Sequence, residues 1–211
     1  MNVPSPTRYH NQNFYRRCGR SGLNLPLISL GQRQNFGGTD SFENGRVIMR
    51  RAFDLGNSHY NLTNNYGPPY GSAEETFDRL LQLDLTPYRG ELVVSTKAGY
   101  DIWPGPYGNC GSRKYLLASL DQSLRRVERF LKPYHIAEDK IIRIRSLDAI
   151  ARQRGDSLTQ MALAWVLRQP AVTTALIGAS KPGQIDENVA AVKNLGFSAD
   201  ELVEIAKVLA N

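Results

Sequence analysis

The sequence predicts an α/β fold with about four parallel strands, flanking helices and an N-terminal β-hairpin. Strand-like and helix-like segments alternate up to residue 126, and the loops that follow the strands are long and rich in Gly and Pro. This alternation is typical of a parallel sheet with right-handed crossovers. The chain has 211 residues, of which 41% are hydrophobic and 22% charged, which is enough for one sizeable core.

The N-terminal half shows three strand–helix pairs, each with local signals. Apolar side chains recur at helical spacing, and glycines or serines mark helix ends. Ser72 with Glu75 has the pattern of a capping box, and Ser112 precedes a helix with a leucine face. The expected elements are a hairpin and strand over residues 15–31, a helix over 43–55, a strand over 58–62, a helix from 72, a strand over 92–96, and a helix from 112 with Leu116, Leu117, Leu120 and Leu124 on one face.

The C-terminal half contains two helices, one strand and two further helices. The expected elements are a helix over residues 138–154, a helix capped by Ser157 and Gln160 that runs to 167, a strand over 173–177, a helix that opens at Pro182, and a helix capped by Ser198 with Glu201. We expect one domain over residues 1–211. It consists of N-terminal βα units (15–126), a junction (127–137) and C-terminal βα units (138–211).

Composition excludes several classes of partner. The net charge is +6, but the arginines are scattered along expected helices and no basic run is interleaved with aromatic residues, so we expect no nucleic-acid partner. No apolar run approaches the roughly 18 residues of a membrane span, and the polar N-terminus lacks the apolar region of a secretory signal. Cys18 and Cys110 have no metal-binding or redox spacing. We therefore expect a cytoplasmic protein without a metal site.

Tyr66 and Lys97 each follow the C-terminal end of an expected strand, on neighbouring βα units. A lysine ammonium close to a tyrosine favours the phenolate and makes the phenol a better proton donor to a carbonyl group. The alternative is a surface tyrosine and a solvated lysine. The spacing alone leaves both interpretations open.

A second pattern joins a buried strand to a helix. The strand leads into Gly178, and Ser180 and Lys181 directly precede the helix that begins at Pro182. Backbone N–H groups at a helix start, with a serine and a lysine beside them, form a phosphate site. A plain strand-to-helix turn with a capping serine is the alternative that this pattern leaves open.

Together these motifs resemble the aldo-keto reductase family, and in particular its bacterial branch similar to glyceraldehyde 3-phosphate reductases and potassium-channel β-subunits. The resemblance covers residues 15–126 and 129–211. The matching segments are Cys18-Gly19-Arg20-Ser21-Gly22-Leu23, Asn64-Asn65-Tyr66-Gly67-Pro68-Pro69, Ser95-Thr96-Lys97-Ala98-Gly99-Tyr100, Trp103-Pro104-Gly105-Pro106-Tyr107-Gly108 and Leu176-Ile177-Gly178-Ala179-Ser180-Lys181-Pro182.

The resemblance implies a (β/α)₈ barrel that transfers hydride from NADPH to an aldehyde or ketone. Its active site holds four residues, Asp, Tyr, Lys and His. Tyr66 falls on the proton donor and Lys97 on the residue that tunes it. The positions that hold the adenosine and its 2′-phosphate correspond to Ser180, Lys181, Gln184 and Asn188.

The chain departs from the family pattern in two places. Asn61 stands where the family has the aspartate, so it can accept a hydrogen bond from Lys97 without balancing its charge. After residue 126 the family continues into a strand that bears the catalytic histidine, whereas this chain passes directly to a stretch similar to the end of the barrel. We therefore expect a partial barrel. His10, His59 and His135 offer no replacement, and His59 is expected to be a satisfied histidine within a strand.

Three functional hypotheses follow. The first is an NADP(H)-dependent reductase of small aldehydes such as glyceraldehyde 3-phosphate or methylglyoxal, in which Arg33 and Trp103 contact an anionic substrate or simply lie at the surface. The second is an inactive NADP-binding or regulatory homologue, and the third is a deleted gene product. An open half-barrel also exposes two strand edges, which favours self-association as a homo-oligomer.

Overall fold

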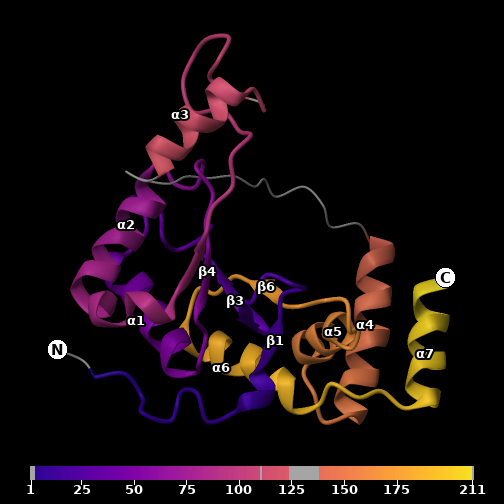
Figure 1. Cartoon of the computed structure of the whole chain (residues 1–211). Coiled ribbons are helices and arrows are strands. Elements are labelled where there is room, and N and C mark those ends of the chain that lie inside the picture. The colour runs from indigo at the N-terminus through magenta and orange to yellow at the C-terminus, as the bar shows by residue number, and fades with distance from the viewer. Residues whose placement is uncertain (1–2, 110, 124–137, 211) are drawn as a thin grey trace.

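Four short parallel strands form the centre of the structure, in the order β5-β4-β3-β6 (Figure 1). The structure is a computed structural model that describes residues 3–109, 111–123 and 138–210. The strands are β3 (Ile28–Gly31), β4 (His59–Asn61), β5 (Val93–Ser95) and β6 (Ala175–Ile177). Because β6 pairs in parallel with β3, residues from both halves of the chain contribute to one sheet. The expected parallel sheet of about four strands is confirmed.

A β-hairpin precedes this sheet, as the sequence predicts. Strands β1 (Tyr15–Arg17) and β2 (Asn24–Pro26) pair antiparallel. The turn between them closes with a 2.8 Å hydrogen bond from the backbone N–H of Cys18 to the carbonyl of Leu23. Two glycines in the turn have positive φ, which side chains with a Cβ rarely adopt.

Helices and apolar side chains pack against one face of the sheet to form the main core. Large side chains at its centre are fully buried, for example Ile28, Leu30, Tyr60 and Leu62. Tyr60 of β4 points to this face, whereas His59 and Asn61 on either side of it point to the other face, because successive side chains of a strand point to opposite sides. The helices are α1 (Phe42–Asp54), α2 (Ser72–Leu80), α3 (Arg113–Ser123), α4 (Glu138–Gln153), α5 (Leu158–Leu167), α6 (Pro182–Ala190) and α7 (Ala199–Ala210).

Helix α2 begins differently from the expected capping box. Its N-cap is Gly71, which has a φ of +108°, and Ser72 is the first helical residue. The Ser72 hydroxyl donates to the carbonyl of Pro69 (2.8 Å) and accepts from the N–H of Gly38 (2.7 Å). The serine is therefore used to join two loops, and the helix itself has no side-chain cap. It continues as a π-helical turn (Leu81–Leu85) and a 3₁₀ helix (Thr86–Glu91) that leads into β5.

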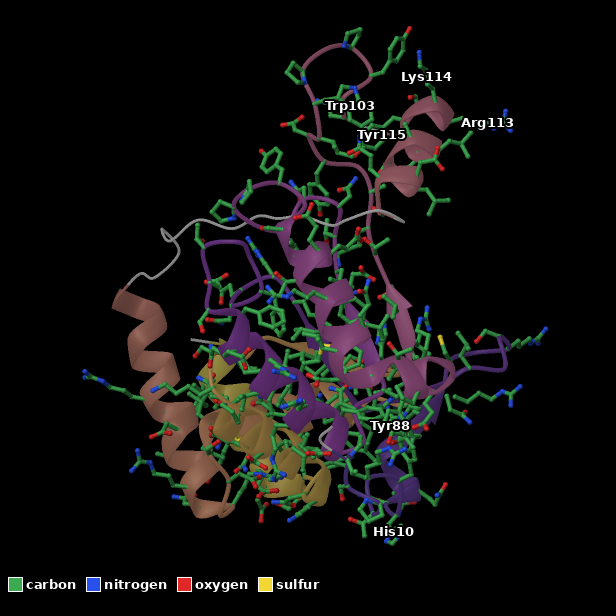
Figure 2. The ribbon with its side chains drawn as sticks, turned by 90° about the vertical axis from the view of Figure 1, so that its left-hand side faces the viewer. His10, Tyr88, Trp103, Arg113, Lys114 and Tyr115 are labelled. Carbon is green, nitrogen blue, oxygen red and sulfur yellow. The ribbon has the colours of Figure 1, made fainter. Side chains whose placement is uncertain are left out.

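Helix α3 does not bury the leucine face that the sequence predicts. Leu116, Leu117 and Leu120 are 44–52% exposed, while the buried residues of the helix are Tyr115 and Ser119. Figure 2 shows Tyr115 beside Trp103 at the end of the molecule opposite His10. Leu120 lines a pocket together with Phe77 and Leu81, and the leucine face remains about half exposed.

The C-terminal helices form a second, smaller core. Ile150, Ala151, Met161 and Ile205 are its buried members, contributed by α4, α5 and α7, which lie together in Figure 1. Both expected caps are present: the Ser157 hydroxyl accepts from the N–H of Gln160 (3.2 Å), and the Ser198 hydroxyl accepts from the N–H of Glu201 (3.2 Å).

Arg154 ties this smaller core together. Its side chain is 2% exposed and forms ion pairs with Asp156 (3.1 Å) and Glu201 (2.9 Å). It also donates to the carbonyls of Asn194 (3.1 Å) and Gly196 (3.0 Å). The guanidinium therefore links the end of α4 to the loop before α7.

The described part of the chain forms a partial barrel. The strands β5 and β6 stand at the two edges of the sheet, so the sheet remains open. An eight-stranded barrel has no such edges. The expected partial (β/α)₈ architecture is confirmed, while the junction at 127–137, together with Cys110, Leu124 and His135, lies outside the described residues.

Candidate functional site

The carboxyl ends of β4 and β5 bring the first group of candidate residues together. Asn61 is paired in register with Ser95, so their side chains share one face of the sheet. The parallel pairing continues beyond both strands, because the N–H of Asn64 donates to the carbonyl of Lys97 (2.9 Å). Lys97 consequently lies beside the loop that carries Tyr66.

Lys97 binds two neutral oxygens. Its ammonium donates to Oδ1 of Asn61 and to the carbonyl of Leu62, the latter at 2.5 Å. Burial lowers the pKa of Lys97 below its usual value. No carboxylate ion pair with Lys97 is present among the described residues, so the amide oxygen of Asn61 and a backbone carbonyl carry the stabilisation of the ammonium.

Tyr66 lies next to Lys97. The Lys97 Nζ is 5.4 Å from the centre of the Tyr66 ring, which is a cation–π distance. Lys97 faces the ring and no hydrogen bond joins it to the Tyr66 hydroxyl within the described structure. An ammonium has three donors, and two are used, so the third remains available for a phenolate or a ligand.

Arg33 follows β3 and is partly buried near the same phenol. Burial lowers the pKa of Arg33, and electrostatic interactions with Tyr66 and Tyr100 act in the opposite direction by raising it. Its buried Nη2 has no hydrogen-bond partner in the described part of the chain. The guanidinium thus presents an unused donor close to the candidate site.

Behind Asn61, a row of polar side chains crosses the sheet. The Asn61 Nδ2 donates to the Ser95 hydroxyl (2.6 Å), which lies 2.9 Å from Nε2 of His59. Nδ1 of His59 lies 2.7 Å from the Ser29 hydroxyl, which lies 2.6 Å from that of Thr174. Burial lowers the pKa of His59, and the Lys97 ammonium lowers it further. His59 is therefore a satisfied strand histidine, as the sequence predicts.

The second group of candidate residues lies at the start of α6. Gly178 and Gly183 have open space where a Cβ would point, and Ser180 and Lys181 are exposed. The Gln184 side chain occupies the donors at this helix start: its Oε1 accepts from the N–H of Ser180 (2.7 Å), the Ser180 hydroxyl (3.0 Å) and the N–H of Lys181 (3.2 Å). An anion that displaced this side-chain oxygen would meet the same donors.

Helix α1 and the loop between β3 and α1 fix the position of this turn. Asn44 donates to the carbonyl of Ser180 (3.1 Å), and Asn35 donates to the carbonyl of Ala179 (3.1 Å). One turn below Gln184, Asn188 is 5% exposed. Asn188 is thus held inside the helix packing, while Ser180, Lys181 and Gln184 remain at the surface.

Sequence reasoning missed Tyr115, which organises the loop after Lys97. Its hydroxyl accepts from Asn64 (3.0 Å) and from the N–H of Gly99 (3.1 Å), and donates to the carbonyl of Tyr100 (2.6 Å). The Trp103 ring centre lies 6.0 Å from that of Tyr115, at the outer end of the same loop (Figure 2). A tyrosine preceding the predicted leucines gives no signal of this role, because its partners lie 15 to 51 positions away.

The described residues show neither a metal-binding cluster nor a membrane-spanning helix. No group of three or more His, Cys, Asp or Glu side chains that could hold a metal ion was found there. Within the same ranges, no helix has both the length and the apolar composition needed to cross a membrane.

The chain is similar to known reductases along its entire length. A model of the aldo/keto reductase family matches residues 27–134 and 132–210. An L-glyceraldehyde 3-phosphate reductase of Escherichia coli O157:H7 is 34% identical over an alignment of 332 positions, gaps included, which spans 99% of this chain and 96% of that protein. The protein of the same description from Escherichia coli K12 is 35% identical over equal spans.

The similarity to channel subunits is more local. A putative voltage-gated potassium channel subunit beta of Schizosaccharomyces pombe is 44% identical over 61 residues, which are 29% of this chain and 18% of that protein. Because this chain has 211 residues, more than a third of the 332 positions aligned with the bacterial reductase have no counterpart in it. Both the family match and the full-length similarity place the chain in the aldo/keto reductase family of oxidoreductases.

Proposed function

We propose that the protein is an NADP(H)-dependent reductase of small aldehydes, of the glyceraldehyde 3-phosphate or methylglyoxal type. The observation that carries this proposal is the position of the Lys97 ammonium 5.4 Å from the Tyr66 ring, at the carboxyl ends of two parallel strands. Family membership adds a small-molecule substrate and a nicotinamide cofactor, which supplies the hydride when it is bound.

In this proposal Tyr66 gives the proton of its hydroxyl to the carbonyl oxygen of the substrate. Lys97 stabilises the phenolate that remains, because a positive charge beside the ring favours its charged form. Asn61 and the carbonyl of Leu62 hold Lys97 in place. Asn61 occupies the family's aspartate position and therefore orients the ammonium without neutralising it.

The start of α6 would hold the adenosine and 2′-phosphate end of the cofactor. The donors at Ser180 and Lys181 now bound by Gln184, the exposed Lys181 ammonium and the open space at Gly178 suit a phosphate group. Asn188, buried on the same helix, would support this end of the site. A positive side chain next to the 2′-phosphate favours NADP over NAD.

The test is NADPH consumption with glyceraldehyde 3-phosphate and with methylglyoxal. We expect turnover by the wild-type protein and a loss of about 10²–10⁴-fold in Tyr66→Phe, because the proton donor is removed. Tyr70→Phe is the matched control, since Tyr70 is 43% exposed, and it should retain full activity. Equal loss in both variants, or turnover unaffected by Tyr66→Phe, contradicts the assignment.

Arg33 supports the phosphate-bearing substrate. Its unused buried donor lies near Tyr66, and a charge-assisted hydrogen bond contributes about 1.5–3 kcal/mol. Arg33→Gln should raise KM for glyceraldehyde 3-phosphate by roughly tenfold or more and leave KM for uncharged methylglyoxal unchanged. An equal effect on both aldehydes argues against an anion contact.

A second candidate function is NADP binding without turnover. It is favoured by the neutral Asn61 and by the missing aligned positions. A ligand at one hundred times its Kd stabilises the folded state by about 2.7 kcal/mol. A rise in Tm with NADP⁺ in a protein that consumes no NADPH would support this function, whereas no rise would leave the α6 site unsupported.

We also propose that residues 1–211 form one domain, with units at 15–126 and 138–211, and that the open sheet edges lead to a homo-oligomer. Within the described ranges no strand pairs with the outer edges of β5 and β6, so these edges are templates for pairing with another copy. Light scattering after size-exclusion chromatography tests this: a monomer at all concentrations contradicts it. The cytoplasmic location stays a prediction from the sequence.

A further inference from the structure

The polar row behind Lys97 has a defined direction. An ammonium can only donate, so the Asn61 atom that faces Lys97 must be the oxygen, and the amide NH₂ must face Ser95. The orientation of this amide is therefore set by chemistry. The Ser95 oxygen then accepts a hydrogen bond from Asn61, and the Ser95 hydroxyl hydrogen needs an acceptor of its own.

The Ser95 proton has His59 Nε2 within reach at 2.9 Å. That nitrogen accepts a hydrogen bond only in the neutral ring that carries its hydrogen on Nδ1. The Nδ1–H then points to the Ser29 hydroxyl (2.7 Å), which in turn can donate to Thr174 (2.6 Å). In this arrangement every hydrogen bond runs in one direction, from Lys97 across the sheet to Thr174.

The opposite tautomer satisfies fewer groups. With the hydrogen on Nε2, Ser95 would accept from both Asn61 and His59, and its own proton would have no acceptor among the described residues. The low pKa of His59, caused by burial and by Lys97, keeps the ring neutral and so able to accept. An unmade hydrogen bond at a partly buried group is unfavourable.

We propose that His59 is a positioning residue: neutral and with its hydrogen on Nδ1, it draws the Ser95 hydroxyl toward itself and thereby holds the Asn61 amide with its oxygen toward Lys97. The proposal rests on the proposed function for the role of Lys97. It assigns Asn61 a second property that an aspartate lacks, since an amide donates to Ser95 and a carboxylate cannot. The tautomer of His59 thus depends on the residue at position 61.

The tautomer is measured directly by two-bond ¹H–¹⁵N NMR of protein labelled at histidine. His59→Gln identifies the signal, and His10→Gln, in the exposed N-terminal tail, is the control that leaves it in place. We expect Nδ1–H in the wild type. In Asn61→Asp the carboxylate accepts from Ser95, so we expect the hydrogen to appear on Nε2.

A second pair of variants guards against misfolding of Asn61→Asp. Ser95→Thr keeps the hydroxyl and should keep Nδ1–H, whereas Ser95→Ala removes the donor to Nε2 and should move the ¹⁵N shift of that nitrogen to the value of an acceptor without a hydrogen bond. A wild-type ring with its hydrogen on Nε2 overturns the proposal without any variant. A ring that stays Nδ1–H in Asn61→Asp, or an Nε2 signal that does not move in Ser95→Ala, overturns it as well.

The link to catalysis has its own readout. If the protein turns over, His59→Gln should lower kcat by about tenfold, the effect of one displaced hydrogen bond, and leave KM for NADPH unchanged, because the α6 turn is untouched. A change in KM alone contradicts a positioning role. A protein with no turnover but with the expected tautomer would refute the proposed activity and leave the tautomer assignment standing.

Discussion

Replacing Asn61 by aspartate should raise the pKa of Lys97. The wild-type ammonium is held by the amide oxygen of Asn61 and the carbonyl of Leu62, and burial lowers its pKa. A carboxylate at position 61 adds a full negative charge at the same contact. We therefore expect the pKa of Lys97 to rise in Asn61→Asp.

The size of the effect follows from Coulomb's law. Two unit charges at 4 Å interact by about 4 kcal/mol at the effective dielectric constant of a protein near its surface. Lys97 is only partly buried, so solvent screening removes much of this. A remainder on the order of 1.4 kcal/mol raises the proton-binding constant of Lys97 tenfold.

The assay is an alkaline titration of lysine side chains followed by ¹³C NMR, in which Lys97→Met identifies the signal. Asn24→Asp is the control, because Asn24 is exposed on the hairpin and the variant adds the same charge far from the sheet ends. If Asn61→Asp leaves the titration of Lys97 unchanged or moves it to lower pH, the reasoning is refuted. An equal rise in Asn24→Asp would show a general charge effect instead.

Three further predictions concern stability. The pKa of His59 is lowered from 6.5 by burial and then by the neighbouring ammonium, so the unfolded chain takes up the proton more readily than the folded one. The stability that His59 contributes above pH 6.5 is therefore lost as the pH falls. The urea midpoint of His59→Gln should fall less steeply with decreasing pH than that of the wild type. Arg154→Met should cost about 3–5 kcal/mol, because it leaves two carboxylates without their buried partner, and urea denaturation that shows less than 1 kcal/mol would contradict this. Gly56→Ala should cost about 1–3 kcal/mol by the same measurement, since φ is +88° and a Cβ would lie 2.4 Å from the carbonyl of Arg8, whereas Gly90→Ala, with open space around it, should be near neutral.

Local signals in the sequence predicted most of the elements and several of their ends. The caps at Ser157 and Ser198 form as expected, because the hydrogen bonds that define them join residues only three positions apart. The alternation of strands and helices predicted the parallel sheet. The placement of Tyr66 and Lys97 after two strands left open whether they meet, and the structure brings them together. These features depend on short-range geometry and on the rule that parallel strands end at one edge.

Local sequence patterns were misleading where a residue's partners in the structure are distant in the sequence. Ser72 has the pattern of a helix cap, yet its hydroxyl binds the carbonyl of Pro69 and the N–H of Gly38. The leucines of α3 have the spacing of an apolar face, yet Leu116, Leu117 and Leu120 are about half exposed. The spacing of apolar residues shows which face of a helix favours burial, but it does not show whether another element packs against that face.

The sequence alone determined which chemical groups stand at the strand ends, including an asparagine where the family has an aspartate. Only the tertiary structure decided how those groups are connected. Ser29 and Thr174 lie 145 positions apart, and they meet because β3 and β6 pair in one register that places both side chains on the face of His59 and Ser95. A shift of that register by one residue would turn these side chains to the opposite face and break the row.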